Sequence, residues 1–509
     1  MKLGVGHILG LSVLAVIVLV GALYVGTRPN TSPTDERGDE KETGAAISLY
    51  CAAGIRLPIQ EIAKEYEKKY NVRVEADYQG SGDLLAAMRA RGSGDLYLAA
   101  DLAYMDDARQ YDLIEEVLPV AAQYPVIAFA KGNPKGIEGI DDLLDSSIKL
   151  SLPEPKSAAI GRVAKSLLES DGVWDEIWER KHTARTKVNE VANDIKMDLV
   201  DAGIVWNATA DQYKELEYVV PKSFRRQDKQ IALAVLKSSK TPTRALHFAR
   251  YITARDKGLE IFDEYGYDVI DGDPWAERPR IVMFSGGVNR PVCEQVVAEF
   301  EEREGVDVDA TYTGCGVLCG NMKAGQIPDI YFSCDVSFMR QVDDLFRPSV
   351  DIASTDMVLI AHKDNPKNIM SVEDLARDDV KVVINNPEHS ALGSLCHKLL
   401  GKSKYDLWNQ VYPKAVDHPT TADVAVMAVV MGSADASIVY RANTIKQAHK
   451  LKVMDIDDPD AYATQPIAVG NNARYPQLTQ RLMDRISAEE MRDRYERGGF
   501  NWLGGATSP

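Results

Sequence analysis

Short apolar runs alternate along the chain with longer segments whose apolar residues recur at helical spacing. Residues 47–51 and 95–99 are apolar runs of strand length, and residues 72–76 alternate between apolar and polar positions. Residues 58–66 place apolar side chains on one helical face, and a second helix is predicted to open at the Gly-Ser-Gly segment 80–82. This order of strands and helices predicts an α/β fold with a parallel sheet covered by helices on both faces.

The same series of motifs occurs twice in the chain. Three pairs of motifs lie 234 positions apart: YQGSG at 78–82 and YTGCG at 312–316, DLYLAAD at 95–101 and DIYFSCD at 329–335, DAGIVW at 201–206 and DASIVY at 435–440. An ordered series at constant spacing indicates a duplication. Because solenoid repeats are far shorter, the sequence predicts two whole domains, copy 1 at 46–275 and copy 2 at 279–503.

Two further matches between the copies depart slightly from the spacing of 234. The segment CAAGIRLPI at 51–59 matches FSGGVNRPV at 284–292 with a spacing of 233, and PEPKSA at 153–158 matches PEHSA at 387–391. The first of these matches pairs Gly54 with Gly287.

The N-terminus departs from the globular pattern. The stretch from Ile8 to Gly26 holds 19 residues without a charge, which is long enough for a helix to cross a bilayer. We therefore expect a membrane anchor or signal segment at 1–26, followed by a polar, flexible linker at 27–45. A cleaved signal peptide is the alternative to an uncleaved transmembrane helix, and both place the bulk of the chain outside the cytoplasm.

Composition excludes several classes of function. With 45% apolar and 27% charged residues the chain is typical of globular proteins, and a net charge of −17 argues against binding to nucleic acid. The sequence carries no phosphate-cradling loop, nucleophile elbow or paired metal-binding histidines, so we expect neither catalysis nor a cofactor. Asp101 and Asp335 each end a strand and precede a helical run, which favours helix capping over acid–base chemistry.

The repeated motifs fall where a ligand would bind. In open α/β sheets, ligands bind beyond the carboxyl ends of strands, where helices begin with free backbone N–H groups. Small residues at Ala53-Gly54 and Gly80-Ser81-Gly82 would let a ligand approach that backbone. Several helix starts aimed at one point form a donor-rich pocket, and a tetrahedral oxyanion suits such a pocket at any net charge of the protein.

With these motifs the chain resembles the periplasmic molybdate/tungstate-binding proteins of ABC importers, over nearly the whole of each copy. The resemblance implies tandem type II periplasmic-binding-protein-like domains, each made of two doubly wound α/β lobes that close on an oxyanion. In copy 1 it implies a site made of Ala53, Gly54, Ser81, Ser157, Ala158, Asn189, Glu190, Val191 and Trp206. In copy 2 it implies a site made of Ser285, Gly287, Cys315, Ser390, Ala391, Asp423, Val424, Ala425 and Tyr440.

The chain departs from that family at several of these positions. Gly54 and Gly287 stand where the family commonly has serine, and Trp206 replaces a tyrosine. Cys315 replaces the serine that copy 1 keeps, which supplies a weaker donor and an oxidisable group. Glu190 would repel an anion if it faced the ligand; turned outward, it would favour the helix dipole. The sequence therefore favours copy 2 as the better-preserved site.

Six cysteines leave three interpretations open. One cysteine lies in copy 1 and five in copy 2, at Cys51, Cys293, Cys315, Cys319, Cys334 and Cys396. They are favoured as small buried residues; disulfides are a second interpretation. A soft-metal site around Cys315 and Cys319, with His389 and Cys334 near it, is a third.

These observations predict a membrane-tethered, extracytoplasmic binding protein for a small oxyanion such as molybdate or tungstate. Lobe closure would capture the anion, and an ABC permease would be the partner that transports it. One alternative is a sensor or scaffold in which one copy has lost its ligand. Another is a thiol- or metal-binding protein centred on Cys315.

Overall fold

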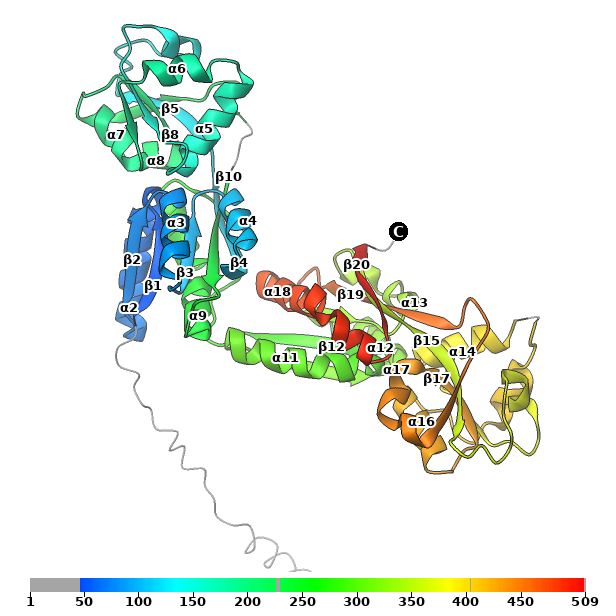
Figure 1. Cartoon of the computed structure of the whole chain (residues 1–509). Helices are drawn as coiled ribbons and strands as arrows, with labels where there is room; N and C mark the ends of the chain where they lie inside the picture. Colours follow the sequence, from blue (N-terminus) through cyan, green and yellow to red (C-terminus); the bar gives the residue numbers. More distant parts are fainter. Residues whose placement is uncertain (1–45, 226–228, 403, 508–509) are drawn as a thin grey trace, which may run out of the picture. The chain divides into compact units, whose positions relative to one another are not determined.

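The computed structural model describes residues 46–225, 229–402 and 404–507. These residues form two copies of one α/β domain, and each copy consists of two lobes (Figure 1). The apolar cores are separate: one cluster of buried side chains runs from Ile47 to Tyr267 and the other from Ile281 to Phe500. Each copy therefore has a hydrophobic core of its own, as expected of a domain.

The first lobe of copy 1, lobe 1A, is a six-stranded sheet in the order β11-β4-β10-β3-β1-β2. Its strands are β1 (Ile47–Ala52), β2 (Val74–Gln79), β3 (Leu96–Ala99), β4 (Ile114–Gln123), β10 (Lys229–Leu236) and β11 (Asp268–Val269). Its helices are η1 (Ala53–Ile55), α2 (Arg56–Tyr70), α3 (Ser81–Arg91), α4 (Ala103–Gln110), α9 (Pro242–Ile252) and α10 (Gly258–Glu264).

The second lobe of copy 1, lobe 1B, is a five-stranded sheet in the order β7-β6-β8-β5-β9. Its strands are β5 (Pro125–Ala130), β6 (Leu150–Pro153), β7 (Thr183–Arg185), β8 (Ala202–Trp206) and β9 (Leu216–Val219). Its helices are η2 (Asp141–Leu144), α5 (Ala159–Ser170), α6 (Trp174–Arg180), α7 (Val188–Lys196) and α8 (Asn207–Asp211).

In copy 2 the strands of both lobes join into one nine-stranded sheet through the long strand β15. Its strands are β12 (Arg280–Gly286), β13 (Asp307–Thr313), β14 (Ile330–Phe332), β15 (Val350–His362), β16 (Val382–Val383), β17 (Ala436–Tyr440), β18 (Leu451–Asp455), β19 (Tyr462–Val469) and β20 (Asn501–Thr507). We call the part around β12, β13, β14 and β19 lobe 2A, and the part around β16, β17 and β18 lobe 2B.

Helices cover the sheet of copy 2 as they do in copy 1. The α-helices are α11 (Arg290–Glu304), α12 (Cys315–Lys323), α13 (Val336–Met339), α14 (Ala391–Leu400), α15 (Trp408–Val411), α16 (Ala422–Val430), α17 (Arg441–Thr444), α18 (Pro476–Ile486) and α19 (Arg492–Arg497). The 3₁₀ turns are η3 (Gly287–Asn289), η4 (Asp343–Leu345), η5 (Val372–Ala376), η6 (Tyr412–Lys414), η7 (Ile445–Lys450) and η8 (Glu489–Met491).

The sheet predicted to be parallel is parallel only in part. Strands β2 and β3 run parallel to β1, as predicted, but β10 runs antiparallel to both β3 and β4. The reason is the two-lobed chain path. Strand β4 leads out of lobe 1A and β10 leads back into it, so the two crossing strands lie side by side in opposite directions.

Helix α2 shows how the local sequence sets these elements. Its apolar residues Ile59, Ile62 and Tyr66 are buried along one face, as their spacing predicts. The helix ends at Asn71, which adopts the left-handed conformation (φ 55°) and donates its N–H to the Glu67 carbonyl. The Glu67 side chain then accepts the N–H of Val74 and so fixes the entry into β2.

At the start of the two copies, residues that are structurally equivalent lie 234 positions apart in the sequence. Strand β1 pairs Ala52 with Gln79, and β12 pairs Gly286 with Thr313 at the same places in their sheets. The spacing of 233 that the sequence match suggested is therefore wrong. Structural equivalence follows the pairing of the strands and not the alignment of the glycines. Gly287 corresponds to Ala53, not to Gly54.

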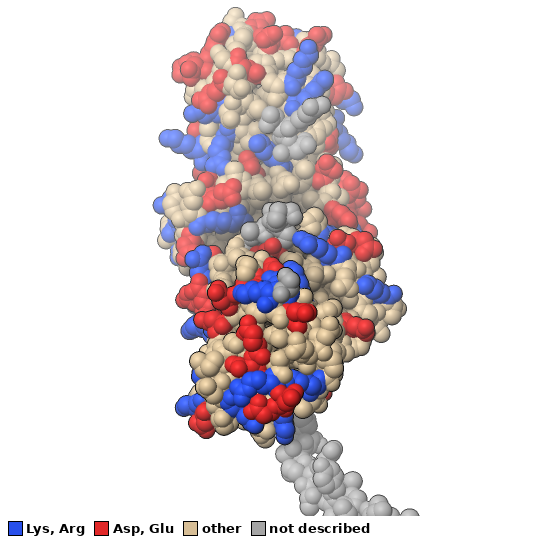
Figure 2. All heavy atoms as spheres, turned by 90° about the vertical axis from the view of Figure 1, so that its right-hand side faces the viewer, with Lys and Arg blue, Asp and Glu red and all other residues tan. Residues whose placement is uncertain are grey.

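The described residues contain no helix long and apolar enough to cross a membrane. The predicted span from Ile8 to Gly26 and the linker at 27–45 lie outside the described residues. On the face in Figure 2, acidic and basic side chains are interspersed, so no single-sign surface appears there that would suit a polyanion.

Candidate functional site

Each copy has a small pocket where its two lobes meet. The pocket of copy 1, pocket 1, is a cavity of about 20 Å³, and that of copy 2, pocket 2, is a cavity of about 10 Å³. Such volumes hold roughly one water molecule. The lobes of both copies are therefore in close contact around a nearly filled space.

The lining of pocket 1 contains five of the nine residues implied by the family resemblance. Those five are Ala53, Gly54, Ser81, Ala158 and Trp206. The rest of the lining comes from Ala52, Gln79, Gly80, Ala100, Ala159, Ile160, Lys187 and Val188. Four residues of the predicted set do not line the pocket: Ser157, Asn189, Glu190 and Val191.

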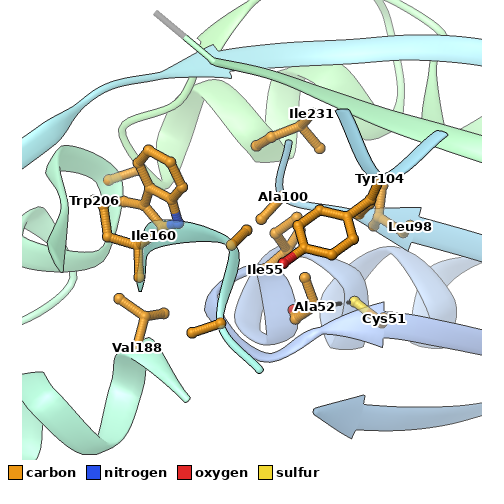
Figure 3. Packing of buried hydrophobic residues seen from close by; sticks show 14 of the residues in the cluster. Cys51, Ala52, Ile55, Leu98, Ala100, Tyr104, Ile160, Val188, Trp206 and Ile231 are labelled. Carbon is orange, nitrogen blue, oxygen red and sulfur yellow. Dashed lines mark hydrogen bonds between the residues drawn. The ribbon is translucent and has the colours of Figure 1, made fainter. Parts of the chain in front are cut away.

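Pocket 1 is predominantly apolar. Figure 3 shows Trp206, Ile160 and Val188 of lobe 1B near Ala52 and Ala100 of lobe 1A. The Ser81 hydroxyl, at the start of α3, accepts the N–H of Ala100 at 3.3 Å and keeps its own proton for a ligand. At the start of α5 the capping position is Ala158, which has no hydroxyl. An anion in this pocket would meet few side-chain donors.

Glu190 turns back onto its own helix. Its carboxylate accepts the backbone N–H of Lys187, at the start of α7, at 3.3 Å. A carboxylate in the first turn is favoured by the helix dipole, which agrees with the outward orientation considered from the sequence. The same bond occupies an N–H group that would otherwise be free to bind a ligand.

The lining of pocket 2 contains three of the nine implied residues, Gly287, Ser390 and Tyr440. The rest comes from Val288, Thr313, Gly314, Cys334, Leu392, Thr420, Thr421 and Ala422. The implied residues that do not line it are Ser285, Cys315, Ala391, Asp423, Val424 and Ala425. This pocket carries several hydroxyl groups where pocket 1 carries carbon.

Two hydroxyl groups of pocket 2 keep a proton available for donation. The Tyr440 side chain is 2% exposed, and its hydroxyl has no hydrogen-bond partner among the residues that the structure describes. Burial raises the pKa of Tyr440 well above its usual value, so the hydroxyl keeps its proton and can donate it. Ser390 caps helix α14, where its oxygen accepts the N–H of Gly393 at 3.4 Å and its proton stays available.

The implied residues outside pocket 2 have other partners or environments. The Ser285 hydroxyl donates to the Gly286 carbonyl, and the Asp423 carboxylate accepts from the Asn443 amide at 2.7 Å. The Val424 side chain is 49% exposed. The helix start faces the pocket through Thr421 and Ala422 instead, two residues earlier than predicted.

Glycines allow the lobes to meet. A side chain at Gly80 would clash with the carbonyls of Ser157 and Thr186, although its backbone (φ −65°) does not require glycine. Next to it, the N–H of Gly82 donates to the Ser157 carbonyl at 2.9 Å, which links lobe 1A to lobe 1B. The glycines of the YQGSG and YTGCG motifs thus serve lobe contact, whereas sequence reasoning assigned this segment to the opening of a helix and to ligand approach.

Gly314 holds the same position in copy 2. A side chain there would clash with the carbonyls of His389 and Thr420 in lobe 2B. Both copies therefore close through a glycine against two backbone carbonyls.

All six cysteines are buried free thiols in this structure. The interpretation as small buried residues is confirmed, and no pair of them forms a disulfide here. Within residues 46–225, 229–402 and 404–507, no three His, Cys, Asp or Glu side chains come together as a metal site. Cys319 approaches Tyr331 and the Phe338 carbonyl, while Cys315 approaches Cys334.

The helix cap predicted for Asp335 is confirmed, whereas Asp101 caps the turn that leads into α4 and is not the N-cap of that helix. Asp335 begins α13, and its carboxylate accepts the N–H of Ser337 at 2.9 Å. Asp101 accepts the N–H of Ala103, the first residue of α4, at 3.0 Å. Both carboxylates are engaged with backbone, so neither is arranged as a general base.

Sequence reasoning missed the threonines of pocket 2. The signal was present in the segment HPTTAD, because Thr421 directly precedes the apolar run that becomes α16 and is a favourable capping residue. It also missed Lys187, which occupies the corresponding position before α7.

Comparison with known proteins supports the duplication. The sequence profile of the family described as "Bacterial extracellular solute-binding protein" matches residues 47–268 and again residues 281–501. A putative binding protein of Haemophilus influenzae is 25% identical over 223 residues, 44% of this chain and 91% of that protein. The molybdate-binding protein ModA of Mycobacterium tuberculosis is 25% identical over 228 residues, 43% of this chain and 84% of that protein.

Solved structures also align with about half of the chain. The substrate-binding domain of a putative molybdenum ABC transporter from Clostridium difficile aligns over 45% of this chain and 100% of its own, with 20% identity and a TM-score of 0.36. The periplasmic molybdate-binding protein of Azotobacter vinelandii covers 44% of this chain and 100% of its own, with 13% identity and a TM-score of 0.39. From the two profile matches, the chain belongs to the family of bacterial extracellular solute-binding proteins and contains two tandem copies of its domain.

Proposed function

We propose that the chain is a membrane-tethered, extracytoplasmic solute-binding protein that captures a small tetrahedral oxyanion of the molybdate and tungstate class. The observation that carries this proposal is the unpartnered, buried hydroxyl of Tyr440 beside the capping Ser390 in pocket 2. A buried donor without a partner costs free energy, and an anion that accepts from it removes that cost.

The remaining groups of pocket 2 suit the same ligand. Helices α14 and α16 both begin at the pocket, through Ser390 and Thr421, and helix starts favour negative charge. Several relatives bear the name molybdate-binding protein, which supports the choice of anion. Each hydrogen bond to a charged ligand contributes about 1.5–3 kcal/mol.

Capture would proceed by lobe closure. The contacts of Gly80 and Gly314 with the opposite lobe describe how closely the lobes approach, and the small cavities mean that they must separate for an anion to enter. An ABC permease is the proposed partner that receives the anion. The segment from Ile8 to Gly26 is the proposed membrane anchor, by its length and lack of charge.

A second candidate is a sensor or scaffold in which copy 1 no longer binds an anion. It is favoured by the lining of pocket 1, where Ala158 and Trp206 stand in place of a capping serine and a tyrosine. In that case copy 1 would serve contact with another protein while copy 2 binds the ligand.

Calorimetry of the full chain with molybdate, tungstate, sulfate, phosphate and a small carboxylate tests the proposal. We expect binding of a tetrahedral oxyanion with at least one site per chain, and an affinity at that site that is at least about tenfold lower in Y440F. A stoichiometry of two anions per chain would exclude the second candidate, in which copy 1 no longer binds. The absence of heat and of thermal stabilisation with every tetrahedral anion would overturn the ligand class.

A further inference from the structure

Two thiols lie next to each other at pocket 2. Cys334 lines the pocket, and Cys315, at the start of α12, lies buried behind it. The Cys315 sulfur accepts the backbone N–H of Cys334 at 3.0 Å, as the Ser81 oxygen accepts that of Ala100 in copy 1. The scaffold is therefore the same in both copies, and only copy 2 carries sulfur at both positions.

Gly286 provides the space for the two sulfurs. A methyl group at Gly286 would clash with the Cys334 sulfur and lie 3.0 Å from the Cys315 sulfur, although the backbone (φ −60°, ψ 140°) does not require glycine. Copy 1 has Ala52 at the corresponding position and Ala100 opposite Cys334. Copy 2 thus lacks the methyl group that Ala52 has in copy 1, and the Cys334 thiol occupies the space. Both sulfurs face Gly286.

Hydrogen bonding differentiates the two thiols. Burial alone would raise the pKa of Cys315, but hydrogen bonds from the thiol and the N–H of Cys334 hold that pKa below its usual value. Donating its proton to Cys315 raises the pKa of Cys334 well above the usual value. The two thiols thus engage each other, and sulfur is the ligand that soft elements favour.

The pocket also offers hydroxyl donors beside the sulfurs. The unpartnered Tyr440 hydroxyl and the Ser390 hydroxyl line the same cavity as Cys334. A bare soft cation would have no use for these donors. A ligand with both a thiophilic centre and an oxygen would use the sulfurs and the hydroxyls together.

We propose that pocket 2 is a dithiol site for a trivalent metalloid oxyacid, of which arsenite is the simplest, with Cys315 and Cys334 as the sulfur ligands. Two arsenic–oxygen bonds of As(OH)₃ break and two arsenic–sulfur bonds form. Each departing hydroxide leaves as water with one thiol proton, so two waters are released and no electrons are transferred. The hydroxyl that remains on arsenic accepts from Tyr440.

This inference deepens the proposed oxyanion function for copy 2 but can fail independently of it. Arsenite and molybdate are therefore tested on the same preparation of the full chain, reduced beforehand and freed of reductant. Arsenic binding without molybdate binding would overturn only the proposal that the ligand is a tetrahedral oxyanion. Molybdate binding without arsenic binding would overturn only the dithiol site.

The variants restore the copy 1 residues one at a time. We expect the wild-type chain to retain one arsenic per chain after gel filtration, measured by native mass spectrometry, and C334A and C315S to retain less than a tenth of that amount. C293A, which removes a buried thiol of α11, should retain one. Equal retention by C334A and the wild type, or no retention by the wild type, would overturn the site.

A graft into copy 1 tests whether the geometry suffices. The triple variant A52G/S81C/A100C places the copy 2 residues at the corresponding positions of copy 1. A native thermal unfolding curve establishes that the variant is folded, and we expect it to retain two arsenics per chain. A folded graft that retains one would overturn the claim that the sulfur pair and its glycine make the site.

Discussion

Pocket 1 and pocket 2 share one scaffold and differ in what they can donate. In both, a strand-to-3₁₀ turn and helix starts meet at the lobe contact. Pocket 1 replaces a tyrosine with Trp206 and a capping serine with Ala158, so it presents mostly carbon and indole. Pocket 2 presents Ser390, Tyr440 and Thr421. Duplication thus preserved the backbone around the lobe contact while the side-chain donors diverged.

The largest expected effect comes from closing off the lobe contact in one copy. G314A adds a methyl group against the carbonyls of His389 and Thr420, and overpacking of about 3 kcal/mol would weaken anion binding by copy 2 about a hundredfold. Calorimetry with molybdate measures it. G80A should act on copy 1 alone, which separates the two sites.

The matched control is G320A. Gly320 lies on α12, the helix that begins at Cys315, directly after Gly314. A Cβ added at Gly320 meets no atom of the described residues within 4 Å, so binding should not change. An unchanged affinity in G314A would contradict lobe closure as the mode of capture.

The tyrosine that distinguishes the pockets gives the next effect. Y440F removes one donor to a charged ligand, and we expect the affinity of copy 2 to fall roughly ten- to hundredfold, for about 1.5–3 kcal/mol. The reverse change, W206Y, should strengthen any anion binding by copy 1. If Y440F binds as tightly as the wild type, Tyr440 does not face the ligand.

The fall in stability that His247 causes in acid should arise in copy 1. His247 on α9 is hydrogen-bonded to Tyr66 at 2.7 Å, and burial with the nearby charges of Arg250 and Lys69 lowers its pKa to about 4. The unfolded chain takes up that proton below about pH 6.5, so stability falls between pH 6.5 and 4, by up to roughly 2 kcal/mol. Arg481 stands at the corresponding position of α18 in copy 2.

Urea unfolding at several pH values measures this effect. The difference in unfolding free energy between the wild type and H247F isolates the histidine from the carboxylates, which titrate in both proteins. That difference should change across pH 6.5 to 4. A constant difference would show that His247 does not contribute to the pH dependence.

The smallest effect concerns the helix cap. S390A removes the hydroxyl that accepts the Gly393 N–H and should cost about 1 kcal/mol of stability, while A158S should stabilise copy 1 by a similar or smaller amount. Urea unfolding at pH 7 checks both. Stabilisation by S390A would contradict its role as a cap.

The fold was predictable in its elements and less so in its connections. Residues 47–51, 58–66 and 96–99 lie in elements where the hydrophobic pattern placed them, since burial on one face dictates that pattern. The strand predicted at 72–76 begins two residues later, at Val74. The antiparallel β10 was not predictable from order alone. Its place depends on the chain leaving one lobe and returning from the other, which no local pattern records.

The candidate site was predictable at positions marked by motifs. Ser390 and Tyr440 line pocket 2, because each ends a strand or begins a helix at the lobe contact. Glu190 and Val424 do not line their pockets, since one helical turn carries a side chain away from the helix start. Cys334 was considered as a small buried residue, a disulfide partner or a soft-metal ligand, and its place in pocket 2 depends on the space left by Gly286.

The connection between lobes also differs between the copies. In copy 1 the chain passes from β4 to β5 through Tyr124, and Pro125 lacks the N–H that a continuous ladder would use. In copy 2 the corresponding Met357 donates its N–H to Ala461, and β15 continues unbroken from Val350 to His362. Opening copy 2 must therefore bend a hydrogen-bonded strand. The anion proposed for copy 2 should therefore dissociate slowly, which would give the closed state of copy 2 a long residence time.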